Sequence, residues 1–166
     1  VMRVCTVPVL ASVPDMATKT KGGYYYTEKK RTSVTTDKES SMVAGNISFA
    51  AAESYKLLRT KLQFSFVDEN DCHVIGLSSA LSGEGKSLTA VNLAYTLSQL
   101  DKKVLLIDCD MRRPTLAEKM NLLKQPGLSN YLTRQCSLDE LAQICQLKSG
   151  ENPFHVITAG QNPPNP

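Results

Sequence analysis

Apolar residues recur with helical spacing in two stretches of the chain. The first stretch begins after Ser48, a residue type that often caps helices, and its apolar positions follow at steps of four and three. Such steps place one apolar face along a helix. The second stretch runs from about Gly85 to Leu100 and predicts another amphipathic helix. The positions that form the two faces are Ala51, Tyr55, Leu58, Leu62 and Phe66 in the first stretch, and Leu88, Val91, Leu93, Ala94 and Leu97 in the second.

Three shorter apolar runs predict strands at 73–79 (HVIGLSS), 103–110 (KVLLIDCD) and 154–159 (FHVITA). The middle run is nearly continuously apolar, as expected of a parallel strand covered on both faces. Short helices are expected at 116–123 and 137–147. Strand, helix, strand, helices and strand form the pattern of a doubly wound parallel sheet flanked by helices. Three strands are few for such a sheet, so the predicted fold is an α/β domain that is incomplete at its C-terminal end.

The N-terminal part of the chain has a different character. Residues 7–14 (VPVLASVP) are apolar and bounded by prolines, which favours a short edge strand. The polar stretch that follows is rich in Ser, Thr and Lys and predicts a linker. Its three tyrosines at 24–26 form either a local packing patch or a set of exposed phosphorylation targets. The chain therefore divides into an N-terminal piece (1–15), a basic linker (16–46) and the α/β domain (47–166).

Composition and charge narrow the range of functions. The 166 residues, 42% of them hydrophobic, are typical of one globular domain. The formal net charge of +3 lies entirely in the linker, whereas a nucleic-acid-binding protein carries its basic residues on the folded domain. The sequence therefore argues against nucleic acid and leaves solvation or an anionic membrane surface for the linker. The five cysteines include no C-x-x-C pair, which fits neither a disulfide framework nor a zinc site and indicates a reducing, cytoplasmic compartment.

A phosphate-binding pattern connects the first predicted strand to the second helix. Residues 80–87 (ALSGEGKS) match A/G-x-x-x-x-G-K-S/T. Gly83 and Gly85 permit backbone conformations that turn N–H groups toward phosphate oxygens, and the helix N-terminus adds its positive end. Lys86 offers a charge to the β and γ phosphates, and Ser87 offers a hydroxyl to magnesium. These features predict a site for ATP and Mg²⁺, with the nucleotide held by Gly83, Glu84, Gly85, Lys86, Ser87 and Leu88.

Two carboxylates follow the second predicted strand, at the sheet edge where ligands of open α/β sheets bind. Asp108 would hold Mg²⁺ directly or through water. Asp110 would help to hold it or would accept a proton from an attacking hydroxyl. Alternatively, the two aspartates only end the strand and pair with Arg112 or Arg113. The predicted catalytic residues are Lys86, Asp108 and Asp110, and the predicted metal ligands are Ser87, Asp108 and Asp110.

Taken together, these segments resemble the bacterial tyrosine kinases of capsule and exopolysaccharide synthesis. The stretch LSSALSGEGKS resembles the family's Walker A motif, and VLLIDCDMRRP resembles its Walker A′ motif. The family's subunit-contact motif, E-x-x-R/K-x-x-R, is matched by Glu53, Lys56 and Arg59, which alone would be a common solvated charge pattern. Residues 127–132 (GLSNYL) and 159–166 (AGQNPPNP) also resemble the family.

The resemblance implies ATP-dependent autophosphorylation on tyrosine between neighbouring subunits of a homo-oligomeric ring, with protein tyrosines as substrates. It also implies a location at the cytoplasmic face of the membrane. The stretch VPVLASVPDM resembles the end of a membrane-anchored chain-length regulator, the expected partner, which is fused upstream in some members. The family's Walker B strand and tyrosine-rich tail would lie downstream of Pro166. The chain as given is therefore expected to hold the phosphate site and to phosphorylate poorly.

Two other functions fit the same P-loop. One is a non-catalytic nucleotide-binding adaptor that couples a membrane regulator to polymerisation. The other is a partition or septum-positioning ATPase, but that group carries a lysine at the position of Leu81.

Overall fold

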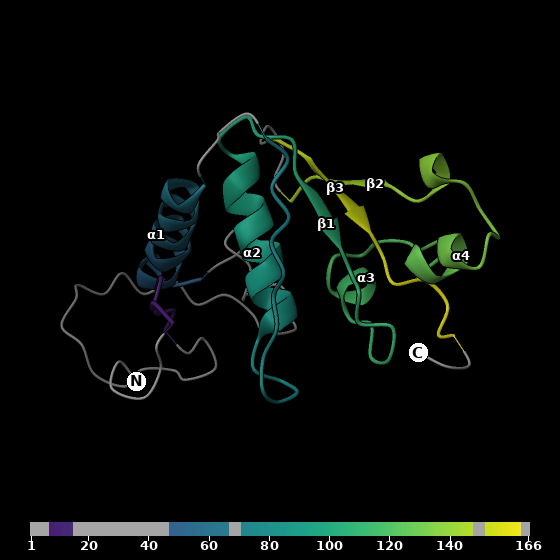
Figure 1. The fold of residues 1–166 in the computed structure, drawn as a ribbon, viewed down its shortest axis with the longest axis horizontal. Coiled ribbons are helices and arrows are strands. Elements are labelled where there is room, and N and C mark those ends of the chain that lie inside the picture. Colours follow the sequence, from purple (N-terminus) through teal and green to yellow (C-terminus); the bar gives the residue numbers. More distant parts are fainter. Residues whose placement is uncertain (1–6, 15–46, 67–70, 148–151, 164–166) are drawn as a thin grey trace, which may run out of the picture.

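Two long helices lie side by side next to a small sheet (Figure 1). The computed structural model describes residues 7–14, 47–66, 71–147 and 152–163. The helices are α1 (Phe49–Ser65), α2 (Lys86–Ser98), α3 (Leu116–Lys119) and α4 (Leu128–Leu132), with a 3-10 turn η1 (Leu138–Glu140). The strands are β1 (Leu105–Ile107), β2 (Gln143–Cys145) and β3 (Phe154–Ile157), in the spatial order β1-β3-β2.

Both amphipathic helices predicted from the sequence are confirmed. The hydroxyl oxygen of Ser48 accepts a hydrogen bond from the Ala51 N–H at 3.2 Å and so caps α1 as predicted. Ala51 and Tyr55 are the buried residues of this helix, and both belong to its predicted apolar face. Across from α1, α2 buries a longer series of side chains: Val91, Asn92, Leu93, Ala94, Tyr95, Thr96 and Ser98.

The sheet is mixed rather than fully parallel. Strand β1 pairs with β3 in parallel, with Leu105 opposite His155, whereas β2 pairs with β3 in the antiparallel direction. The sequence predicts a helix at 137–147, and this prediction is wrong. The stretch forms η1 and then β2, because residues 143–145 pair with the edge of β3 and bury Cys145. Short apolar runs do not distinguish helix from strand by their spacing alone.

The predicted strand at 73–79 lies outside the sheet. This stretch runs extended along α2 (Figure 1) and belongs to no strand pair. An apolar groove separates it from β1, with Leu93 and Leu97 of α2 among the lining residues. The parallel register with β3 turns the backbone groups of Leu105 and Ile107 away from β3, toward the free edge of β1. The prediction of strand pairing at 73–79 is therefore wrong for the described residues.

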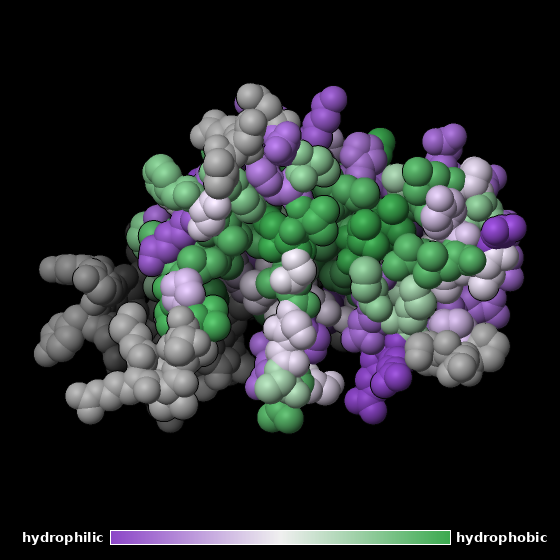
Figure 2. Space-filling view, in the orientation of Figure 1, coloured by the Kyte–Doolittle hydropathy of each residue, from purple (hydrophilic) through white to green (hydrophobic). Residues whose placement is uncertain are grey.

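The prediction that both faces of β1 are covered is also wrong. Leu105 and Ile107 are 51% and 43% exposed, because only the face that carries Leu106 packs on the core. Figure 2 shows apolar side chains gathered in the middle of the visible face, over α2 and the sheet. The buried core between these elements consists of Val91, Ala94, Tyr95, Leu116, Met120, Cys145, Phe154 and Val156.

The remaining predicted elements agree with the structure only in part. The predicted edge strand at 7–14 is absent, since these residues adopt no strand. The predicted helix at 116–123 is confirmed as the shorter α3, and the predicted strand at 154–159 as β3. Most of the predicted linker, including the tyrosines at 24–26, lies outside the described residues. No helix within the described ranges combines the length and apolar character that a membrane crossing requires.

Two of the segments that carry the family resemblance pack against each other. The N–H groups of Leu128 and Ser129 donate to the carbonyls of Thr158 and Ala159 at 2.8 and 2.9 Å. A Cβ atom at Gly127 would overlap the backbone of Gly160 and Thr158, so only glycine fits there. The start of α4 and the end of β3 therefore form one interlocked unit, and the sequence analysis predicted neither α4 nor this contact.

Candidate nucleotide site

The turn before α2 has the backbone conformation that a phosphate-binding loop needs. Gly83 and Gly85 both lie in the left-handed region, at φ values of 89° and 88°. Glycine adopts this conformation without the steric penalty that a Cβ atom brings. Gly85 is the N-cap of α2 and offers no side-chain hydrogen bond to the helix. The first N–H groups of α2 are therefore left to bind a ligand at the positive end of the helix.

Polar side chains close this loop on itself. The Lys86 ammonium donates to the Ser79 hydroxyl oxygen at 3.0 Å, and that hydroxyl donates to the Leu81 carbonyl at 2.8 Å. The Leu81 N–H donates to the Glu84 carboxylate at 3.0 Å. Glu84 thus supplies a negative oxygen to a loop amide, which is the kind of contact that a phosphate oxygen makes. Ser87 and Leu88, the other predicted contacts, lie half-buried in the first turn of α2.

Ser79 is a candidate site residue that the sequence analysis missed. Its hydroxyl holds the Lys86 side chain over the loop. The available signal was its position as the last residue of the apolar run before the P-loop.

The pair of aspartates follows β1 directly. The Asp108 N–H donates to the Ile157 carbonyl at 2.9 Å, which ties this residue to β3. Asp108 as a whole is only 4% exposed, and its Oδ1 accepts the Asp110 N–H at 3.1 Å. Asp110 is exposed, and its Oδ1 accepts the Arg113 N–H at 3.0 Å. Each aspartate therefore uses one oxygen to shape the loop.

The second carboxylate oxygen of Asp108 is buried and has no hydrogen-bond partner among the described residues. Burial raises the pKa of Asp108 above its ordinary value of 3.8, and the negative charge of Asp110 acts in the same direction. The backbone amides of Asp110 and Leu116 and the charge of Lys119 oppose this shift. A buried anionic oxygen without a partner is energetically unfavourable. Such an oxygen is suited to contact a hard cation such as Mg²⁺.

The turn before α2 (80–85, the phosphate loop) and the turn after β1 (108–113, the aspartate loop) lie at the same end of the molecule, the lower end in Figure 1. They are not joined through Lys86, because its ammonium donates to Ser79. No group of three or more His, Cys, Asp or Glu side chains gathers as a metal centre in the described parts of the chain. A cation at Asp108 would therefore be shared with other oxygen ligands, as is usual for Mg²⁺ on a bound nucleotide.

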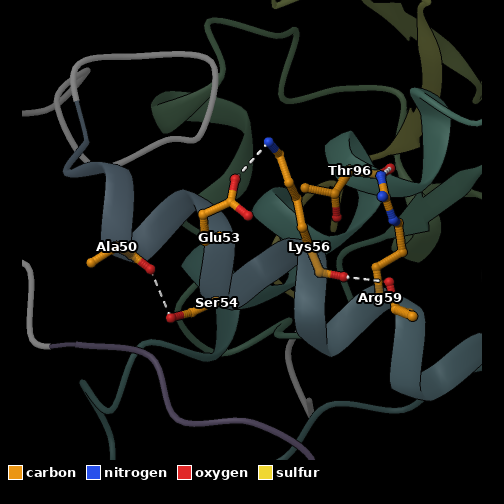
Figure 3. A network of polar contacts seen from close by, with 7 residues as sticks. Ala50, Glu53, Ser54, Lys56, Arg59 and Thr96 are labelled. Carbon is orange, nitrogen blue, oxygen red and sulfur yellow. Dashed lines mark hydrogen bonds and ion pairs between the residues drawn. The ribbon is translucent and has the colours of Figure 1, made fainter.

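The three charged residues on α1 do not form one group. Glu53 and Lys56 pair with each other at 2.8 Å and are 47% and 52% exposed. The Arg59 guanidinium instead donates through Nη1 to the Thr96 carbonyl of α2 at 2.7 Å. Figure 3 shows Arg59 reaching toward Thr96 and away from the Glu53–Lys56 pair.

Comparison with known proteins adds a family and named relatives. The model of the CobQ/CobB/MinD/ParA nucleotide-binding domain matches residues 75–157. Tyrosine-protein kinase YwqD of Bacillus subtilis (strain 168) is 41% identical over 115 residues, covering 69% of this chain and 46% of YwqD. Tyrosine-protein kinase Etk of Escherichia coli (strain K12) is 35% identical over 125 residues, covering 75% of this chain and 16% of Etk. The chain thus spans less than half the length of either kinase.

A solved structure supports the same relationship. The kinase domain of Escherichia coli tyrosine kinase ETK superimposes with a TM-score of 0.72 at 28% sequence identity. The match covers 96% of this chain and 58% of the ETK kinase domain. The predicted α/β P-loop fold is therefore confirmed.

Proposed function

Because the chain belongs to the CobQ/CobB/MinD/ParA family of nucleotide-binding domains, we propose that it binds ATP as part of a protein-tyrosine autokinase. The observation that carries the proposal is the left-handed backbone at Gly83 and Gly85, directly before α2. The named relatives favour a kinase over a partition ATPase, since YwqD and Etk are both tyrosine-protein kinases. The link to capsule or exopolysaccharide synthesis rests on the resemblance of the sequence segments.

The phosphate half of the proposed site is formed by the loop and the first turn of α2. The amides around Gly83 and Gly85 would bind the phosphate oxygens of ATP, in place of the Glu84 carboxylate that now contacts the loop. Lys86 would exchange its contact with Ser79 for the β and γ phosphates. Ser87 follows at the second position of α2, where its hydroxyl can serve as a metal ligand.

The metal half of the proposed site is formed by the aspartate loop. Asp108 and Asp110 would hold Mg²⁺ together with Ser87, and the buried free oxygen of Asp108 fits a cation. When bound, Mg²⁺ neutralises the charge that develops on the phosphates. Alternatively, Asp110, which is exposed, would leave the cation to Asp108 and Ser87 and would accept the proton of a tyrosine hydroxyl as its oxygen bonds to the γ phosphorus. The bond between the γ phosphorus and the oxygen that bridges it to the β phosphorus breaks, and its electron pair leaves with ADP.

Helix α1 is the proposed contact with a second copy of the chain in a ring. Its outer face carries the Glu53–Lys56 ion pair. Three large apolar side chains on the same helix are also exposed: Phe49 (81%), Leu57 (49%) and Phe64 (86%). Aromatic side chains are enriched in protein–protein contacts, and polar residues surround them at the rim. A membrane-anchored chain-length regulator at the cytoplasmic face of the membrane is the proposed partner of the assembly.

The test is incubation of the protein with Mg-ATP, followed by mass spectrometry for phosphotyrosine and calorimetry for ATP binding. We expect ATP binding from the chain as given, and phosphotyrosine from a protein that also carries the Walker B strand and the tyrosine-rich tail of the resembled family. Lys86→Ala should weaken ATP binding at least about tenfold, since it removes the cation that faces the phosphates. ATP binding without phosphotyrosine in that longer protein would identify a nucleotide-binding adaptor. Equal ATP affinity in the parent and Lys86→Ala would refute the P-loop assignment.

A further inference from the structure

The charged row on α1 consists of Glu53, Lys56 and Arg59. It begins on the exposed side of the helix and ends at the interface between α1 and α2. Residues three apart on an α-helix differ by about 60° around its axis, because the helix has 3.6 residues per turn. From Glu53 to Arg59 the row therefore rotates by about 120°, toward the side of the buried Tyr55. Glu53 and Lys56 remain exposed, whereas the Nε atom of Arg59 is buried. The same sequence pattern thus places its last member, the half-buried Arg59, against the neighbouring helix α2.

The contact that Arg59 makes lies at the C-terminal end of α2. Thr96 is in the last turn of that helix, where carbonyls lack partners within the helix. The Leu100 N–H, the ordinary partner of the Thr96 carbonyl, donates to Leu97 instead, at 3.1 Å. The Thr96 carbonyl is thereby left to accept the Arg59 guanidinium at 2.7 Å (Figure 3).

The charge of Arg59 also suits this place. The last turn of α2 contains no basic residue of its own, and a cation at a helix C-terminus is favoured by the helix dipole. The N-terminus of the same helix is the phosphate-binding end. Arg59 and the proposed phosphate site therefore act on opposite ends of one helix, which itself packs on the sheet core through Val91, Ala94 and Tyr95.

We propose that Arg59 is a positioning residue that acts within the subunit: it caps the C-terminus of α2 and fixes the contact helix α1 to the nucleotide-binding helix. Glu53 and Lys56 are the members of the row that a neighbouring subunit can reach. Assembly through α1 and ATP binding at α2 are then linked through Arg59. The inference rests on the proposed function, because it takes the N-terminus of α2 as the ATP site.

Three variants test this role. Arg59→Ala removes the cap, Arg59→Lys keeps a cation that can still donate to Thr96, and Lys61→Ala removes a cation from the exposed side of the same helix. At concentrations where the parent is monomeric, we expect Arg59→Ala to lower the thermal midpoint by about 4 °C. Its affinity for ATP should fall about three- to tenfold. Arg59→Lys should recover part of both losses, and Lys61→Ala should match the parent.

Sedimentation velocity over a range of concentrations completes the experiment. Arg59→Ala should assemble less only in proportion to the fraction of the protein that is unfolded. Lys56→Ala should no longer assemble, but its monomer should keep the parental thermal midpoint. The inference is overturned if monomeric Arg59→Ala keeps the parental midpoint and ATP affinity and loses only assembly. It is also overturned if the midpoint falls while ATP affinity stays unchanged. A parent protein that does not bind ATP would refute the proposed function, and the thermal comparison would still test the cap. If Arg59→Ala does not fold, the cap is supported and Arg59→Lys carries the affinity measurement.

Discussion

Replacing Asp108 by Asn separates the cost of burying a carboxylate from its use as a metal ligand. In the structure, Asp108 is 4% exposed and one of its oxygens has no partner among the described residues. The Asn side chain has nearly the same shape and keeps the oxygen that accepts the Asp110 N–H. The substitution therefore removes the charge and leaves the loop geometry in place.

The expected effect on the nucleotide-free protein is a gain in stability. A buried polar group without a partner costs about 1–3 kcal/mol, and more when it is charged. The Asn amide still leaves one group unpartnered, so we expect a gain in the free energy of unfolding of about 1 kcal/mol. For a domain of this size that gain raises the thermal midpoint by about 4 °C.

The gain should depend on pH. Burial raises the pKa of Asp108 above 3.8, its ordinary value in an unfolded chain. The folded state then holds the proton more tightly than the unfolded state, so the stability of the parent falls as pH rises between these two pKa values. Asn does not titrate. The difference in stability between Asp108→Asn and the parent should therefore be small at pH 3 and reach its full size near neutral pH.

With nucleotide the effect should reverse. Mg-ATP at a concentration about one hundred times its Kd would stabilise the parent by about 2.7 kcal/mol. Asp108→Asn should lose most of this added stability, and removal of Mg²⁺ by EDTA should reduce the parent's shift to that of the variant. The assay is thermal unfolding with no ligand, with Mg-ATP and with ATP plus EDTA, and the exposed Asp139→Asn serves as control. A variant that is less stable without ligand and keeps the full Mg²⁺-dependent shift would refute this reasoning.

Two further predictions concern the fold that supports the site. Gly127→Ala should lower the free energy of unfolding by more than about 2 kcal/mol in urea, because the new Cβ would overlap the backbone of Gly160. Gly76→Ala, where a Cβ meets nothing within 4 Å, is the matched control, and equal effects would contradict the interlock. Ser48→Ala should cost about 1 kcal/mol by removing the cap of α1, and Ser48→Asp should restore it. If Ser48→Ala is as stable as the parent in unfolding followed by circular dichroism, the cap contributes nothing.

The features that could be predicted from the sequence are those with a local cause. The phosphate loop depends on glycines at fixed positions between a strand-like run and a helix, and Gly83 and Gly85 adopt the required conformations. Both long helices follow from apolar spacing and, for α1, from the cap at Ser48. Each of these features involves residues close together in the chain, so the sequence contains the information directly.

The features that could not be predicted depend on partners far along the chain. Residues 143–145 become a strand only because the edge of β3 is available for pairing. Whether 73–79 joins the sheet depends on which segment lies beside β1, and the spacing of apolar residues does not encode that. The inward turn of Arg59 could have been predicted in part, because its position relative to Tyr55 follows from helical geometry. Its partner, the Thr96 carbonyl, depends on how α1 packs on α2.

This difference between local and distant causes runs through the candidate site itself. The phosphate half is built by consecutive residues at the start of α2, whereas the metal half depends on β3, where the Ile157 carbonyl holds the Asp108 N–H. The segment after β3 is in turn locked to α4 by the close approach of Gly127 and Gly160. A change at this interlock should therefore disturb Asp108 while the loop at Gly83 and Gly85 stays formed. Gly127→Ala should therefore still bind ATP through the phosphate half of the site, but its binding should no longer respond to Mg²⁺.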